Sequence, residues 1–142
     1  MPPIADVLPH SGPMILLDEV VAFDGAGVRC RVTIRPGSMF VDHGRVPAIV
    51  ALEYMAQAAA AHAGLEGQSR GEGPRVGYIL GTRELSLEVD DFEVGDELVV
   101  EARKLEGDER LVRFRCIVTR QGERVASADL NVLQGHGKEH PE

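Results

Sequence analysis

One segment constrains the fold of this chain more than any other. From residue 47 to residue 64 the sequence is apolar nearly all the way round and rich in alanine, and Glu53 is its only residue of the Asp, Glu, Lys and Arg types. Pro47 suits the first position of a helix and Gly64 suits the residue after the last, so this segment is predicted to be a helix that ends at Gly64. A helix that is apolar on every side must be surrounded by other structure. The rest of the chain is therefore expected to wrap around it.

The flanking sequence has the pattern of antiparallel strands. In residues 28–35, for example, Val28, Cys30, Val32 and Ile34 alternate with polar side chains, which is typical of a half-buried strand. The predicted fold class is α+β, a hotdog fold in which a curled antiparallel sheet wraps around one long central helix. Residues 1–133 are predicted to form one domain and 134–142 a polar tail. The predicted strands are 14–22 and 28–35, joined by a turn at 24–27, and then 76–88, 97–105, 111–120 and 124–133, with a turn at 92–96. Because such a sheet leaves open edges, two copies are expected to pair.

Composition excludes several classes of protein. The 142 residues are 44% hydrophobic and 27% charged, which suits one globular domain with its own core. The net charge of -8 argues against nucleic acid or an anionic membrane as partner. The N-terminus has neither the basic nor the long apolar region of a signal peptide, so a cytoplasmic protein is expected.

The cysteines and histidines do not predict a metal site. Cys30 and Cys116 are far apart in the sequence, and each lies in an alternating stretch where a thiol behaves as a small buried hydrophobe. His136 and His140 are spaced i,i+4 in the polar tail, without further ligands. No metal and no cofactor are expected.

An ordered set of segments resembles the FabZ/FabA-type 3-hydroxyacyl-acyl carrier protein dehydratases, and within them the dehydratase-like proteins of aryl polyene biosynthesis. The set begins with Leu-Pro-His-Ser-Gly-Pro-Met-Ile-Leu-Leu-Asp at 8–18 and continues with Leu-Glu-Tyr-Met-Ala-Gln at 52–57. Tyr-Ile-Leu-Gly-Thr at 78–82 and Phe-Glu-Val-Gly-Asp-Glu-Leu at 92–98 complete it. The resemblance implies a hydro-lyase that acts on acyl thioesters bound to acyl carrier protein in fatty-acid or polyene-type lipid synthesis.

The resemblance also implies the site residues. Glu53, six residues after Pro47, matches the catalytic acid on the helix, and His43 in the preceding loop matches the histidine that meets it across the dimer interface. His10 matches a position with a structural role, and His62 is interpreted as a packed or capping residue.

Dehydration requires a base, an acid and donors for the thioester oxygen. A neutral histidine suits the base, and a carboxyl group whose pKa burial raises suits the acid. Backbone amides at the helix start near Ala48 are candidates for binding the thioester oxygen. Gln57, one turn after Glu53, is placed to orient it.

Two other functions remain open. In a hotdog thioesterase, Glu53 would activate water and His43 would not be required. As a catalytically silent subunit, the chain would stabilise a heterodimer with an active dehydratase. The loop between His43 and Pro47 is shorter than in the family, which favours this hypothesis. Homodimer and heterodimer are thus both expected partners, and Arg31 and Arg45, from two arginine-containing stretches, are candidates for docking the acidic carrier protein.

Overall fold

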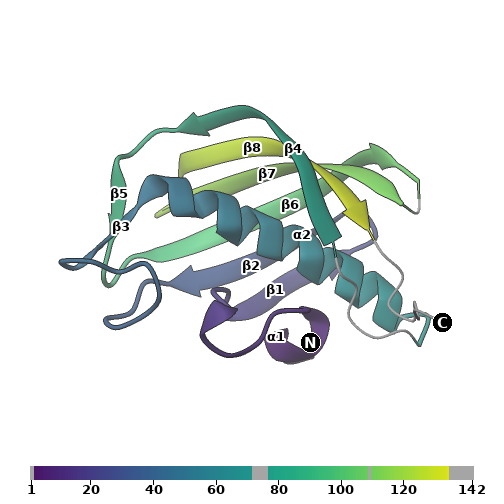
Figure 1. Cartoon of the computed structure of the whole chain (residues 1–142), viewed down its shortest axis with the longest axis horizontal. Coiled ribbons are helices and arrows are strands. Elements are labelled where there is room, and N and C mark those ends of the chain that lie inside the picture. The colour runs from purple at the N-terminus through teal and green to yellow at the C-terminus, as the bar shows by residue number, and fades with distance from the viewer. Residues whose placement is uncertain (1, 72–76, 109, 135–142) are drawn as a thin grey trace.

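The computed structural model describes residues 2–71, 77–108 and 110–134. A six-stranded antiparallel sheet curves around one long helix, α2 (Ala51–Gln68), which crosses its concave face (Figure 1). The strand order is β1-β2-β6-β7-β8-β4, and the sheet is not closed into a barrel. The predicted hotdog arrangement is confirmed: two strands precede the helix and four strands of the same sheet follow it.

The strands are close to their predicted positions. The sheet contains β1 (Glu19–Asp24), β2 (Gly27–Thr33), β4 (Gly77–Leu87), β6 (Glu97–Gly107), β7 (Leu111–Arg120) and β8 (Glu123–Gln134). In β7 the apolar residues at alternate positions are buried and those between them are more exposed, as the period of two predicts. Strand β8 extends one residue beyond the predicted domain boundary at 133, and residues 135–142 of the expected tail lie outside the described residues.

The N-terminal segment differs from the prediction of a strand over 14–22. It forms a short helix α1 (Ile4–Val7) and a 3-10 turn η1 (Gly12–Met14), and β1 begins only at Glu19. The physical reason is a side chain from α2: Gln57 accepts a hydrogen bond from the Leu16 amide and donates one to the Met14 carbonyl. These backbone groups are paired with a helix side chain rather than with a neighbouring strand.

The predicted end of the central helix at Gly64 is wrong, because α2 continues to Gln68. A Cβ added at Gly64 would lie 2.1 Å from the carbonyl oxygen of Val7. Glycine is therefore present at 64 because α1 approaches the helix backbone there, not because the helix stops. The predicted start at Pro47 is also early, since a 3-10 turn, η2 (Ala48–Val50), precedes α2.

A two-stranded ribbon was not predicted. Strand β3 (Arg45–Pro47) pairs with β5 (Asp91–Glu93), within the segment expected to be only a turn. Val46 and Phe92 lie opposite each other in this ribbon and are both buried, and the Phe92 ring is 6.2 Å from that of Tyr54 on α2. The ribbon therefore covers the N-terminal end of the central helix (Figure 1).

Both cysteines are free and buried, as predicted. Burial raises the pKa of the Cys30 and Cys116 thiols to about 12, so neither is a nucleophile at neutral pH. Among the described residues, no helix is long and apolar enough to cross a membrane.

Candidate functional site

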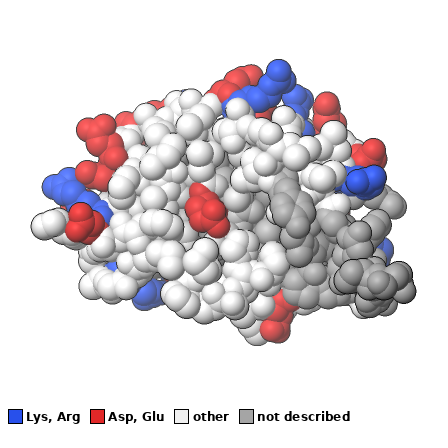
Figure 2. Space-filling view, viewed as in Figure 1, with Lys and Arg blue, Asp and Glu red and all other residues white. Residues whose placement is uncertain are grey.

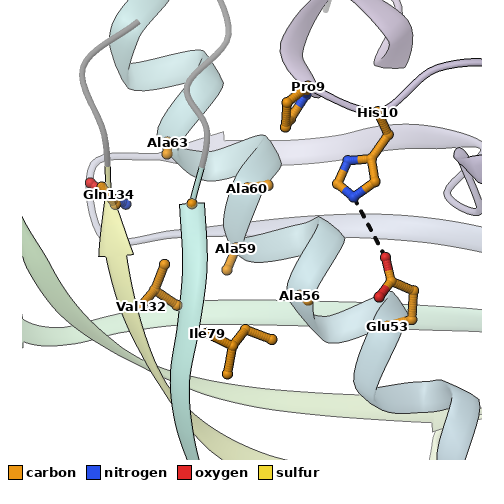
Figure 3. A pocket seen from close by; sticks show the side chains of 11 residues that line it. Pro9, His10, Glu53, Ala56, Ala59, Ala60, Ala63, Ile79, Val132 and Gln134 are labelled. Carbon is orange, nitrogen blue, oxygen red and sulfur yellow. Dashed lines mark ion pairs between the residues drawn. The ribbon is translucent and has the colours of Figure 1, made fainter. Parts of the chain in front are cut away.

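The acidic residue of the apolar helix lies at the edge of a cavity. Glu53, Ala56, Ala59, Ala60 and Ala63 lie along one side of α2 and line a cavity of about 180 Å³. The lining is completed by Gly77 and Ile79 of β4, Val132 and Gln134 of β8, and Pro9 and His10 of the N-terminal segment (Figure 3). The alanines leave room beside the helix that larger side chains would fill, and they give the cavity its apolar wall.

The Glu53 side chain is 39% exposed in the single chain, so it is less buried than the sequence predicts. Glu53 also lines a second cavity, of about 300 Å³. Its apolar lining comes from the segment around η1, the loop before β3, η2 and the first turn of α2: Met14, Leu16, Met39, Phe40, Ile49, Val50 and Leu52. The carboxylate therefore lies where an alanine-lined cavity and a methionine- and phenylalanine-lined cavity meet. A molecule with a polar centre and an apolar chain suits such an arrangement.

Gln57 fixes the orientation of the Glu53 carboxylate. The fully buried Gln57 amide group accepts from Leu16 N at 2.9 Å and donates to Met14 O at 2.7 Å, and these backbone partners allow only one orientation of the amide. Its Nε2 also donates to Glu53 Oε2 at 3.0 Å. Oε2 is therefore an acceptor, and Oε1 is the oxygen of Glu53 left to carry a proton in the acid form.

His10 faces Glu53 from the opposite wall of the cavity. Its Nε2 is 3.5 Å from Glu53 Oε2, and the two side chains point toward each other (Figure 3). From the family resemblance, His10 was expected to have only a structural role. Its distance from Glu53 along the chain, 43 residues, gave no signal that the two would meet, because the approach depends on how the N-terminal segment packs on α2.

The structure places the predicted histidine elsewhere. The His43 side chain is 91% exposed, and its Nδ1 lies 3.0 Å from Asp42 Oδ1. The backbone of His43 has a positive φ of 55°. It lines neither of the two cavities that Glu53 lines. The predicted meeting of His43 and Glu53 across a dimer interface involves a second chain and stays a prediction.

The amide of Ala48 is already engaged. Ala48 is buried, and its N–H donates to Asp90 O at 3.0 Å, which joins η2 to the residue before β5. In this arrangement that N–H is not available to a thioester oxygen. Of the predicted site residues, the single chain thus brings together Glu53 and Gln57, and adds His10.

Comparison with known proteins agrees with this architecture. The family model for ApeP-like proteins, described as ApeP dehydratase, matches residues 2–140. The chain belongs to this family. Its function is dehydratase-like.

Dehydratases are among the individual relatives. The chain is 26% identical over 136 residues to the 3-hydroxyacyl-[acyl-carrier-protein] dehydratase FabZ of Bartonella bacilliformis, covering 92% of this chain and 86% of FabZ. It superposes with a TM-score of 0.91 and 30% identity on a chain of the dehydratase heterocomplex ApeI:P from Xenorhabdus doucetiae, covering 98% of this chain and 95% of that one. Cj0977, a virulence protein from Campylobacter jejuni, superposes with a TM-score of 0.71 at 14% identity over 98% of both chains, which shows a shared fold alone.

Proposed function

We propose that the chain dehydrates 3-hydroxyacyl thioesters to 2-enoyl thioesters, with Glu53 as the acid that protonates the departing hydroxyl group. The observation that carries this proposal is the placement of Glu53 between two apolar cavities, with Oε2 held by Gln57 and Oε1 without a hydrogen bond to any residue that the structure describes. A carboxylic acid in such a place can donate its proton to a leaving hydroxyl, while the apolar walls bind the acyl chain. Gln57 is the positioning residue that orients this acid.

Acyl carrier protein is the proposed carrier of the substrate, and fatty-acid or polyene-type synthesis, including aryl polyenes, the proposed context. FabZ of Bartonella bacilliformis, as its name states, acts on acyl carrier protein substrates. Arg31 and Arg45, the predicted docking residues, lie on the surface in ion pairs with Glu19 and Asp91. Exposed pairs of this kind contribute little free energy, so an acidic partner can compete for the arginines. The cytoplasmic location stays a prediction.

We further propose that the chain works as a pair with a second hotdog chain. Strand β4 is the last strand of the described sheet and presents four partly exposed apolar side chains, Ile79, Leu80, Leu85 and Leu87. Figure 2 shows the molecule from the side seen in Figure 1. This face is largely free of charge, with one acidic side chain near its middle and most charged residues at the rim. An open strand edge beside an uncharged face favours pairing. ApeI:P is a heterocomplex, which supports a pair of two different chains; a homodimer is the alternative.

The oligomeric state tests this pairing. Leu80 is 60% exposed on β4, and Leu105 is 43% exposed on β6, away from that edge. Leu80→Glu should weaken pairing in sedimentation velocity, either of the chain alone or with its partner, whereas Leu105→Glu should leave it intact. Equal behaviour of the two variants would argue against the β4 edge as the interface.

The dehydratase activity is tested with 3-hydroxyacyl-acyl carrier protein and followed by the loss of one water in the mass of the acyl group. The chain is assayed alone and with a FabZ-type partner chain. Glu53→Gln should lower kcat by about 100- to 10,000-fold, the usual contribution of a general acid. Glu66→Gln, the same change on the same helix outside the cavity, is the matched control. Free thiol without enoyl product would indicate a thioesterase, and activity that stays with the partner when Glu53 is changed would indicate a silent subunit.

A further inference from the structure

His10 and Glu53 form a pair within one chain. Figure 3 shows the imidazole reaching down from the N-terminal segment and the carboxylate reaching up from α2, on two sides of one cavity. The 3.5 Å between Nε2 and Oε2 is longer than a good hydrogen bond. The ring and the carboxylate are near neighbours that do not hold each other in a tight hydrogen bond. Both line the same cavity, so both can contact a substrate bound there.

The segment that carries His10 is anchored on both sides. Before it, Val7 and Leu8 are buried, and Val7 packs against Gly64 of α2. After it, Met14 and Leu16 are bound through their backbone to Gln57, the residue that also orients Glu53. The acid and the histidine are thus positioned by the same helix, as a preorganised site requires.

The surroundings of the His10 ring do not fit a purely structural role. A histidine buried for structural reasons normally has its ring nitrogens hydrogen-bonded. In the described part of the chain, His10 Nδ1 is buried without a hydrogen-bond partner, and the contact of Nε2 with Glu53 is the only polar contact of the ring. The ring instead presents one nitrogen to a cavity and to a carboxyl group.

We infer that His10 is the catalytic base of the proposed dehydration, so that each chain carries its own acid–base pair and the exposed His43 is not required. This inference rests on the proposed function. Neutral His10 removes a proton from C2 of the substrate through Nε2, and the C2–H electron pair becomes the C2–C3 double bond. The C3–O bond breaks with its electrons, and the Glu53 proton converts the leaving hydroxide to water.

The short distance between the two groups then closes the cycle. After the elimination His10 is an imidazolium and Glu53 a carboxylate. Transfer of the Nε2 proton to the carboxylate, either directly to Oε2 at 3.5 Å or through a water molecule to Oε1, regenerates a neutral base and a protonated acid, and no net proton is taken from solvent. The balance is one 3-hydroxyacyl thioester in, and one enoyl thioester and one water out.

The test compares His10→Ala with His43→Ala, in the assembly in which the wild-type chain converts 3-hydroxyacyl-acyl carrier protein. His10→Ala should lower kcat by about 100- to 10,000-fold, the range for loss of a general base. The His43 variant decides between the two histidines and should keep wild-type kcat. Thermal unfolding of both variants checks that the fold survives.

Chemical rescue separates a base from a residue that only holds the structure. The His10→Ala substitution removes the ring and leaves space beside Glu53. Added imidazole should then restore turnover in proportion to the concentration of its unprotonated form. Retained activity in His10→Ala, or loss only in His43→Ala, would overturn the inference and leave the proposed function intact. Loss of activity in a folded His10→Ala that imidazole does not restore would also overturn it. A wild-type chain that makes no enoyl product in any assembly would overturn both.

Discussion

Gln57 Nε2 donates to Glu53 Oε2 at 3.0 Å, and the remaining hydrogen bonds of that amide go to the backbone of the segment that carries His10. One buried side chain thus couples the fold of the N-terminal segment to the orientation of the candidate acid. Hydrogen bonding inside the protein interior is strong enough to hold such a geometry, because water does not compete for the same groups.

Gln57→Leu should therefore affect stability and activity together. The change leaves the Leu16 N–H and the Met14 carbonyl without this partner, and because both bonds are partly buried their loss should cost part of the about 1–3 kcal/mol of a fully buried unsatisfied group. We expect a lower midpoint in urea unfolding and a fall in kcat larger than the change in KM, since the acid loses its orientation rather than the acyl chain its binding site. A variant with normal stability and normal kcat would show that Gln57 positions neither element.

Gly64→Ala tests the close approach of α1 to α2. An added Cβ would lie 2.1 Å from Val7 O, so the helices must separate. Alanine gains about 1 kcal/mol of helix propensity over glycine, but overpacking costs about 1–3 kcal/mol and here meets backbone that cannot move alone, so we expect a net loss of about 2 kcal/mol in the free energy of unfolding. Gly25→Ala, where the new Cβ meets nothing within 4 Å, is the control and should unfold as the wild type does.

The strands and the central helix could be predicted from the sequence because each depends on how apolar residues are spaced within a short segment. In β7 the alternation of Val112, Phe114 and Cys116 with polar residues specifies a strand whatever its neighbours. Gly64 shows where such patterns fail. A glycine after an apolar run predicts a helix end, but here glycine is required because the backbone of Val7 lies against the helix, which the local sequence does not indicate. The β3–β5 ribbon pairs residues 45–47 with 91–93, a separation over which no local signal acts.

The candidate site divides in the same way. Glu53 could be singled out because a carboxylate inside an apolar helix is costly, and Gln57 because it lies one turn later on the same face. His10 could not, because its meeting with Glu53 depends on three contacts of the N-terminal segment with α2 that involve Val7, Met14 and Leu16.

Ala60→Leu should shorten the acyl chains that the cavity accepts. Ala60 lines the 180 Å³ cavity and is only partly buried, so a larger side chain can be accommodated without disrupting the core. We expect kcat/KM to fall strongly for long 3-hydroxyacyl substrates and little for a four-carbon substrate, because the leucine occupies the space of the distal carbons. Ala22→Leu, on the exposed side of β1, should leave the chain-length profile unchanged. An unchanged profile in Ala60→Leu would place the acyl chain elsewhere.

His62 should make the stability of the chain depend on pH. The ring is fully buried between Phe23 and Phe114, with centroids 5.2 and 5.7 Å away. Burial lowers the pKa of His62 below its ordinary value of 6.5, although the Glu66 carboxylate 3.8 Å away opposes the shift, and Lys104 on β6 reinforces it. The backbone of Asp24 and Gly25 near the ring favours the protonated form but does not outweigh burial.

The sign of the effect follows from linkage. In the unfolded chain His62 takes up its proton at the ordinary value, whereas in the folded chain it does so only at lower pH, so acidification below about pH 6.5 favours the unfolded state until the folded pKa is reached. The free energy of unfolding, measured in urea at steps from pH 7.5 to 5, should fall over this window in the wild type and fall less in His62→Leu. Because His10 and His43 are present in both proteins, the difference between the two curves isolates His62. Parallel curves would mean that His62 has the same proton affinity in both states.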